Sequence, residues 1–129
     1  MTSQTEHPVE ISVTDLIRLY RGMFLSRRVD ERQRALKRQQ KTFFQMSCAG
    51  HEAVLAAAGL VLKPGIDWVY PYYRDQALCL TLGMTTVDVL LEAAGSGAAP
   101  FSGGRQMPNH WGSRRLHIAS RSSTTGMHF

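Results

Sequence analysis

The feature that most constrains the fold of this chain is a change of pattern within residues 66–82, where a short apolar run gives way to helical spacing. Residues 66–69 are mostly apolar, and the segment that follows them reads Tyr70-Pro71-Tyr72-Tyr73-Arg74-Asp75. The pattern predicts a strand over residues 67–70, a turn at the proline, and a helix over residues 75–82. A strand that leads into a helix is the repeating unit of α/β folds with a parallel sheet.

Helical spacing also predicts a long helix near the N-terminus and an alanine-rich helix after it. Ser12 or Thr14 can cap the first helix, which extends to about residue 39. The second helix ends at residue 62, because Pro64-Gly65 cannot continue it. Its many small residues would let another element approach closely, so we expect this helix to be central and buried.

The C-terminal half contains one more helix and one more strand. Thr85 or Thr86 can cap a helix over residues 87–94, and a loop rich in Gly, Pro and Ser follows it. A second strand is predicted at residues 116–120, and two strands cannot complete a parallel sheet. We therefore expect an incomplete α/β fold with a helical N-terminal part. On this interpretation residues 1–11 are a disordered lead-in and residues 12–129 are the N-terminal part of a larger domain.

The positive charge is concentrated in the first helix. Nine of the 15 Lys and Arg residues lie between Arg18 and Lys41, and only Asp30 and Glu31 oppose them there. Such a face is usually solvated, or it docks an acidic partner. A small basic module that binds an acidic protein or nucleic acid is therefore our alternative hypothesis. The sequence contains no zinc-finger, RNP-type or helix-turn-helix signature that would favour nucleic acid.

The cysteines and the hydropathy pattern favour a cytoplasmic protein. Cys48 and Cys79 are too few for a disulfide framework and lack metal-ligand spacing, so we expect both to be reduced and buried. No apolar run approaches the roughly 20 residues that a membrane-spanning helix needs. The first ten residues also differ from a secretory signal or a transit peptide. We expect no membrane association.

Arg74 suggests a ligand. An arginine at the mouth of a strand–helix junction can donate two hydrogen bonds to a phosphate, and the beginning of the following helix also favours an anion. The alternative is a buried tyrosine cluster in which Arg74 is paired with Asp75 or Asp67. The same ambiguity applies to His51 and Glu52. We interpret them as residues that satisfy the free N–H groups at the start of their helix, rather than as ligand contacts.

Four segments together resemble a known family. Gly104-Arg105-Gln106-Met107-Pro108-Asn109-His110-Trp111-Gly112 resembles a loop of the alpha subunit of branched-chain 2-oxo acid dehydrogenases. Tyr73-Arg74-Asp75, Gly50-His51-Glu52-Ala53 and the Arg27-Arg28 pair are also similar to segments of that family, in the same order. The resemblance covers the chain from about residue 14 to its end, and the long loop is its most specific part.

The resemblance implies roles for five residues. Tyr73 and Arg74 would contact the diphosphate of thiamine diphosphate, as the anion hypothesis also suggests. Ser123 would approach the same diphosphate, and Thr125 stands where the family has a leucine against the aminopyrimidine ring. Threonine would offer less apolar surface to that ring than leucine does. His110 would line the active-site funnel as a candidate catalytic residue, although a solvent-exposed loop position is an almost equal alternative.

The resemblance also implies a thiamine diphosphate-binding fold, cofactors and partners. The family decarboxylates a 2-oxo acid and passes the acyl group to the lipoyl group of an acyltransferase component, with no role for nucleic acid. Its alpha subunit pairs with a beta subunit in a heterotetramer, or is fused to it. A Gly-Asp-Gly or Gly-Glu-Gly segment anchors Mg2+, and none occurs before Phe129. We therefore expect no metal site within this chain, and an isolated N-terminal fragment that binds cofactor weakly and is inactive.

Overall fold

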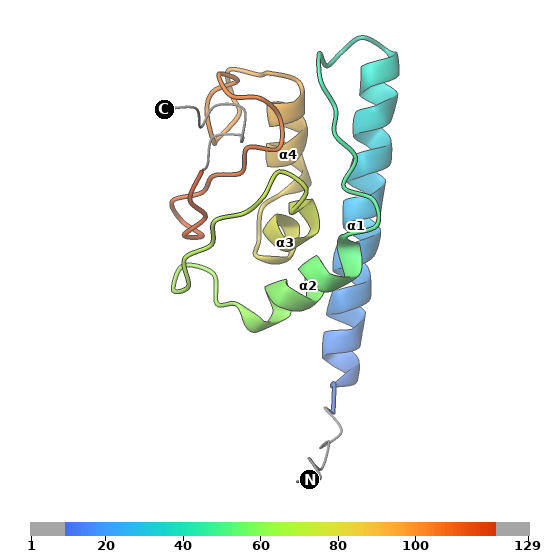
Figure 1. The fold of residues 1–129 in the computed structure, drawn as a ribbon, viewed down its shortest axis with the longest axis vertical. Helices are drawn as coiled ribbons and strands as arrows, with labels where there is room; N and C mark the ends of the chain where they lie inside the picture. Colours follow the sequence, from blue (N-terminus) through green and yellow to red (C-terminus); the bar gives the residue numbers. More distant parts are fainter. Residues whose placement is uncertain (1–9, 121–129) are drawn as a thin grey trace, which may run out of the picture.

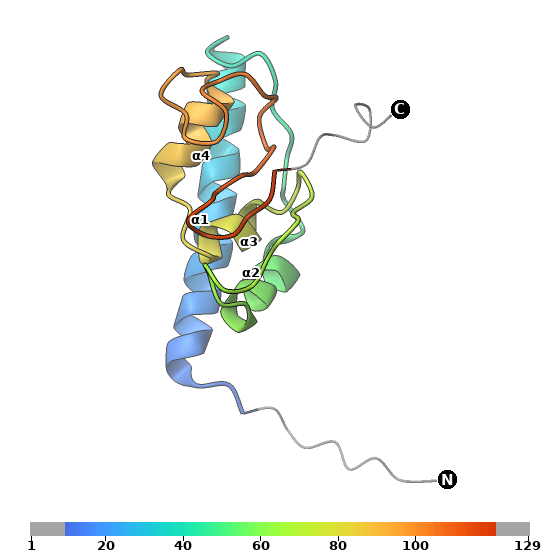
Figure 2. The same ribbon diagram turned by 90° about the vertical axis from the view of Figure 1, so that its left-hand side faces the viewer.

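The computed structural model describes residues 10–120, which fold around four helices. Helix α1 (Val13–Arg38) runs along most of the molecule, and the segment after it returns alongside the same helix (Figure 1). Helices α2 (Glu52–Val61), α3 (Gln76–Thr81) and α4 (Thr86–Ala93) all pack on one side of α1. Figure 2 shows the loops of residues 94–120 lying across α3 and α4. The predicted lead-in falls almost entirely outside the described residues.

The predicted helix boundaries are confirmed where a capping side chain fixes them. The Ser12 side chain accepts a hydrogen bond from the N–H of Asp15 and so starts α1. Thr85 and Asp88 form a reciprocal capping box at the start of α4. Gly83 and Gly95 adopt φ values of 110° and 64° after α3 and α4, a conformation that ends a helix at low cost only for glycine.

The two predicted strands are reduced to one pairing position, and residues 10–120 contain no strand longer than an isolated bridge. Val69 pairs in parallel with Ile118: its N–H donates to the carbonyl of His117 at 2.9 Å, and its own carbonyl accepts from Ala119 at 2.8 Å. Pro71 has no N–H with which to make the next ladder bond. The N–H of Asp67 instead donates to Lys63 in a turn, so the ladder stops on both sides.

Helix α2 packs closely through its small residues, as the sequence predicted, but the expectation that it is buried is wrong: only one face is covered, and Val54 and Val61 are 68% and 80% exposed. Gly59 lies against α3 so closely that an added Cβ atom would stand 2.6 Å from Cβ of Thr81. Gly22 of α1 approaches the same threonine, since its added Cβ atom would lie 2.8 Å from Oγ1 of Thr81. Three helices therefore meet around one side chain, at a distance that only glycine permits.

The core lies between α3, α4 and the C-terminal loops. Its buried side chains surround Trp111, and they are Val29, Val69, Leu78, Cys79, Leu80, Leu82, Met84, Val89, Leu116 and Ile118. The N-terminal half of α1 contributes little, because Val13, Ile17 and Tyr20 remain exposed there. In the described part of the chain, no helix combines the length and the apolar character needed to cross a membrane.

Candidate functional site

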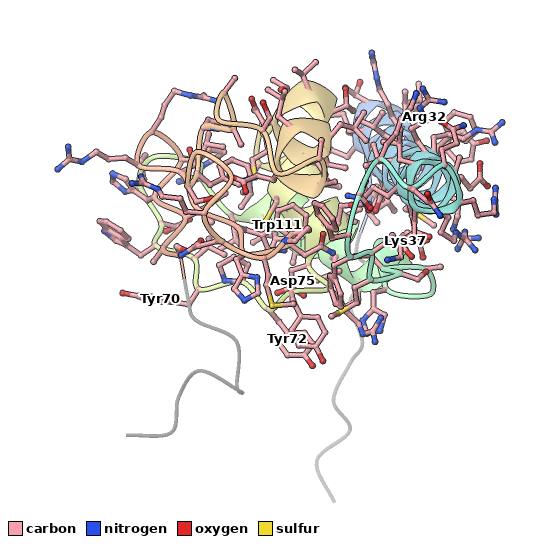
Figure 3. The ribbon with its side chains drawn as sticks, turned by 90° about the horizontal axis from the view of Figure 1, so that it is seen from above. Arg32, Lys37, Tyr70, Tyr72, Asp75 and Trp111 are labelled. Atoms are coloured by element: carbon pink, nitrogen blue, oxygen red, sulfur yellow. The ribbon has the colours of Figure 1, made fainter. Side chains whose placement is uncertain are left out.

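Three loop segments that are distant in sequence converge beside the start of α3. They are residues 46–48 after α1, residues 72–75 before α3, and residues 109–111 in the glycine-rich loop. Trp111 Nε1 donates to the carbonyl of Tyr72 at 3.1 Å, and Asn109 Nδ2 lies 3.4 Å from Sγ of Cys48. Figure 3 shows Trp111 in the interior, Asp75 beside it, and Tyr72 pointing outward at the edge. Two of the four segments of the sequence resemblance, around residues 73–75 and 109–111, thus contribute to one region.

A closed turn presents the tyrosines and Arg74. The N–H of Asp75 donates to the carbonyl of Tyr72 at 3.0 Å, and Oδ2 of Asp75 accepts from the N–H of Tyr72 at 2.7 Å. The Asp75 carboxylate is therefore occupied by the backbone of its own turn. Asp67 is occupied in the same way, because its Oδ2 accepts from the N–H of Lys63 at 2.7 Å.

Arg74 is half-buried and keeps its positive charge without a carboxylate partner among residues 10–120. Nη1 donates to the carbonyl of Ser47, and the guanidinium carbon lies 5.5 Å from the centre of the Tyr73 ring. The alternative in which Arg74 is paired with Asp75 or Asp67 is therefore wrong. A guanidinium has five N–H donors, and a carbonyl bond to one of them leaves donors for an anion.

The Tyr73 ring beside this guanidinium packs in turn against the Tyr72 ring. The rings of Tyr72 and Tyr73 lie 3.7 Å apart between centres at a tilted angle. A hydrogen bond with the Tyr73 side chain raises the pKa of the Tyr72 phenol above its ordinary value of 10.0. A phenol hydroxyl is a donor that can bind an anionic oxygen.

Cys48 packs behind the turn and is a structural thiol. It is buried, and Asn109 lies on one side of its sulfur and the carbonyl of Tyr73 on the other. Burial, followed by the nearby charge of Asp30, raises the pKa of the Cys48 thiol from 9.0 to about 12. Burial also raises the pKa of Cys79. Both cysteines are free and buried, as the sequence predicted.

A buried carboxylate on α4 holds the glycine-rich loop in place. Oε1 of Glu92 accepts from the N–H groups of Phe101 and Ser102 at 3.2 and 3.0 Å. Oγ of Ser102 in turn accepts from the N–H groups of Arg105 and Gln106, each at 3.1 Å. Sequence reasoning missed Glu92. The available signal was an acidic residue at a position where helical spacing calls for a buried side chain.

His110 lies in this loop but bonds to its own backbone. Nδ1 is 2.9 Å from the carbonyl of Met107 and 3.3 Å from the carbonyl of Pro108. Carbonyls only accept hydrogen bonds, so Nδ1 is the donor in these contacts and Nε2 is the other ring nitrogen. The structure brings His110 into the same loop as Asn109 and Trp111, while Ser123 and Thr125 lie outside the described residues.

Glu52 is a helix-start residue, as predicted, and it joins α1 to α2. Oε1 accepts from Nε of Arg27 at 2.6 Å, and Oε2 accepts from the N–H of Gly50 at 2.7 Å. Burial raises the pKa of Glu52, but the hydrogen bonds from Arg27 and from the backbone outweigh it, and the net pKa is lowered. The same hydrogen bond to Glu52 raises the pKa of Arg27.

The basic helix carries less free charge than its sequence indicates. Four of its arginines form ion pairs: Arg18 with Asp15, Arg27 with Glu52, Arg28 with Glu31, and Arg34 with Asp30. Arg32 and Lys37 project from the opposite side of the molecule to Tyr70 (Figure 3). Arg32 and Lys37 therefore lie away from Tyr70, whereas Arg34 on the same helix pairs with Asp30, which binds Ser47.

The donors around Arg74 suit an anion rather than a metal ion. A guanidinium and phenol hydroxyls donate hydrogen bonds, whereas a metal cation needs electron-pair donors such as carboxylate, imidazole or thiolate groups. Within residues 10–120, no three His, Cys, Asp or Glu side chains gather in an arrangement that could hold a metal ion. A diphosphate group fits this donor set.

Comparison with known proteins connects this geometry to a family. The model of the dehydrogenase E1 component family matches residues 20–128. The chain is 37% identical over 123 residues to the "2-oxoisovalerate dehydrogenase subunit alpha" of Bacillus subtilis, covering 95% of this chain and 37% of that protein. It is 32% identical over 120 residues to the protein of the same name in Pseudomonas aeruginosa, covering 93% of this chain and 29% of that protein.

A eukaryotic relative shows the same relationship. The chain is 31% identical over 115 residues to the "2-oxoisovalerate dehydrogenase subunit alpha 1, mitochondrial" of Arabidopsis thaliana, covering 89% of this chain and 24% of that protein. Nearly all of this chain is matched in the two bacterial relatives, but it spans only 37% and 29% of their lengths. Since the family model covers most of the chain, including all three converging segments, the chain belongs to the dehydrogenase E1 component family.

Proposed function

We propose that this chain is the cofactor-binding N-terminal part of a thiamine diphosphate-dependent 2-oxo acid dehydrogenase. The observation that carries the proposal is the half-buried Arg74 guanidinium, which stands beside Tyr73 with no carboxylate partner in the described region. A charge held in this way is costly unless an anion completes its hydrogen bonds. The diphosphate of the cofactor is such an anion.

Each described residue has a definite task in this proposal. Arg74 donates N–H groups to phosphate oxygens, and the phenol groups of Tyr72 and Tyr73 add neutral donors beside it. His110, whose Nδ1 is held by the carbonyl of Met107, is the proposed catalytic residue of the loop, with Nε2 as the ring nitrogen that would meet the substrate. Thiamine diphosphate, when bound, supplies the chemistry that releases carbon dioxide from a 2-oxo acid.

The substrate we propose is a branched-chain 2-oxo acid. The named relatives are 2-oxoisovalerate dehydrogenase subunits, and the loop around Gln106, Met107 and Pro108 favours that group on sequence grounds. In the complete enzyme the acyl group passes to a lipoyl group on an acyltransferase, and a beta subunit, separate or fused, completes the heterotetramer. Mg2+ is the second cofactor we propose, and Ser123 and Thr125 remain proposed cofactor-binding residues. A cytoplasmic location remains a prediction.

The fold we propose for the complete domain is the thiamine diphosphate-binding α/β fold. The parallel bridge between Val69 and Ile118 is its first pairing position, and it joins residues 49 apart in sequence. The main-chain direction at this bridge matches that of a parallel sheet. Helices α3 and α4 lie between the two paired segments in the chain, as a crossover connection requires.

An assay of the complete protein with its partner subunit tests the proposal. We expect consumption of 3-methyl-2-oxobutanoate that requires both thiamine diphosphate and Mg2+, with a higher kcat/KM than for pyruvate. Consumption that does not need the cofactor, or no consumption of either acid, would contradict the proposed activity. A preference for pyruvate would leave the cofactor chemistry standing and refute only the branched-chain assignment.

A further inference from the structure

Asp30 is a buried carboxylate on α1 whose oxygens are all used by one neighbouring segment and one arginine. The residue is 1% exposed. Oδ1 accepts from the N–H of Cys48 at 2.9 Å and from Nε2 of Gln45 at 3.3 Å. Oδ2 accepts from Oγ of Ser47 at 3.0 Å and lies 3.0 Å from Nη2 of Arg34. Burial of a charge is costly, and these four donors offset that cost.

The segment fixed by Asp30 is the one that orients Arg74. Asp30 binds Ser47 through its hydroxyl and Cys48 through its N–H, so the peptide between these two residues is held on both sides. The carbonyl of that peptide, which belongs to Ser47, accepts the hydrogen bond from Nη1 of Arg74. A chain of direct contacts therefore leads from Asp30 through Ser47 to the guanidinium.

We propose that Asp30 is a positioning residue for cofactor binding: it fixes the Ser47 carbonyl, which anchors one nitrogen of Arg74 and directs its remaining donors toward the diphosphate. The inference rests on the proposed function, because it assumes that Arg74 binds this group. Preorganisation of this kind improves affinity, since the side chain is not ordered anew when the ligand binds. Asp30 itself does not touch the cofactor.

The chemistry of the contacts makes Asp30→Asn an informative change. The amide has nearly the same shape, but it carries no charge and has one acceptor oxygen in place of two. An amide oxygen oriented toward Cys48 would place the NH2 group against Arg34, which only donates, and would oblige the Ser47 hydroxyl to turn and accept. The constraint on the 45–48 segment is therefore weakened without a change in volume, because a charged acceptor of Ser47 and Arg34 is lost.

The test measures affinity for thiamine diphosphate by isothermal titration in the complete protein with Mg2+. We expect Asp30→Asn to bind about tenfold more weakly than the wild type, the loss expected when a coupled hydrogen-bond network is broken. Glu31→Gln is the matched control, since it removes one exposed carboxylate from the next position of α1, and we expect unchanged affinity. Circular dichroism and thermal unfolding show whether each variant is folded.

Ser47→Ala is the second variant, in case Asp30→Asn does not fold. It removes only the hydroxyl contact to Asp30, and we expect about threefold weaker binding with an unchanged fold. A double-mutant cycle then separates positioning from general destabilisation. In an Arg74→Ala background, Asp30→Asn or Ser47→Ala should cause little further loss of affinity, because the side chain through which they act is gone.

The possible results distinguish this inference from the proposed function. If the wild type binds thiamine diphosphate and Arg74→Ala weakens binding, but folded Asp30→Asn binds as the wild type does, the Asp30 inference is overturned alone. An equal loss from Asp30→Asn with and without Arg74 would also overturn it. If the wild type does not bind the cofactor, or binds without needing Arg74, the proposed function fails and this inference fails with it.

Discussion

Trp111 Nε1 donates a hydrogen bond of 3.1 Å to the carbonyl of Tyr72, and this contact joins the glycine-rich loop to the turn that carries Arg74. The indole is 2% exposed, and its ring meets Phe101 edge-on with centres 6.5 Å apart. One side chain thus belongs both to the core and to the edge of the candidate site. The position of the loop therefore depends on the packing of the core.

Trp111→Phe should destabilise the fold and loosen the loop. The change removes the hydrogen bond and part of a buried ring, which should lower the free energy of unfolding by about 2 kcal/mol. Trp68→Phe is the matched control, because Trp68 is 61% exposed and only stacks on His117, and its effect should stay within about 0.5 kcal/mol. Denaturant unfolding measures both variants. Equal losses of unfolding free energy in the two variants would show that the buried Trp111 contributes no more to stability than the exposed Trp68.

Gly59→Ala should destabilise the packing of α2 on α3. Alanine favours a helix by about 1 kcal/mol over glycine. The new Cβ atom would lie 2.6 Å from Cβ of Thr81, however, and such overpacking costs about 1–3 kcal/mol. Gly97→Ala adds the same methyl group in open space and should leave the melting temperature nearly unchanged. A Gly59→Ala protein as stable as the wild type would mean that the helices separate readily.

Glu52→Gln should remove part of the pH dependence of stability. The folded state lowers the pKa of Glu52 below 4.5, so its carboxylate stabilises the fold fully above that pH and loses this effect as the pH falls through the lower, folded-state pKa. The difference in melting temperature between wild type and variant should therefore be largest near neutral pH and shrink in acid. Glu31→Gln, at an exposed pair with Arg28, should show almost no difference at any pH.

The two thiols should be unreactive until the protein unfolds. Burial raises the pKa of Cys48 to about 12 and also raises that of Cys79, and the thiolate is the reactive form. An aromatic disulfide reagent at about pH 8 should label neither cysteine in the native protein and both after addition of denaturant. Rapid labelling of a native thiol would show that the turn around Tyr73 opens.

The sequence was informative where a feature depends on neighbouring residues. Ser12 and Thr85 cap their helices with side chains three residues from the groups they bind, and Gly83 and Gly95 end helices through their own φ values. Periodicity and capping patterns report such local interactions directly. All four helices were therefore predicted, with small differences at their ends.

The sequence was less informative where distant segments meet. Whether residues 67–70 form a strand depends on a partner 49 residues away, and only one position pairs because Pro71 and Asp67 cannot extend the ladder. Asp30 and Glu92 appear in the sequence as ordinary charges on helices. Their role depends on backbone N–H groups that the fold brings to them. Helical periodicity does not predict which distant N–H groups will contact a given carboxylate.

The affinity of the complete protein for thiamine diphosphate, compared between wild type, Arg74→Ala and Arg32→Ala, tests the central claim most directly. Isothermal titration with Mg2+ measures the dissociation constant, and Arg32 is the control because it projects from the opposite side of the molecule to Tyr70 and Tyr72 (Figure 3). We predict at least about tenfold weaker binding for Arg74→Ala, the cost of losing charged hydrogen bonds to a phosphate, and unchanged binding for Arg32→Ala. Equal affinity in all three proteins would contradict the account.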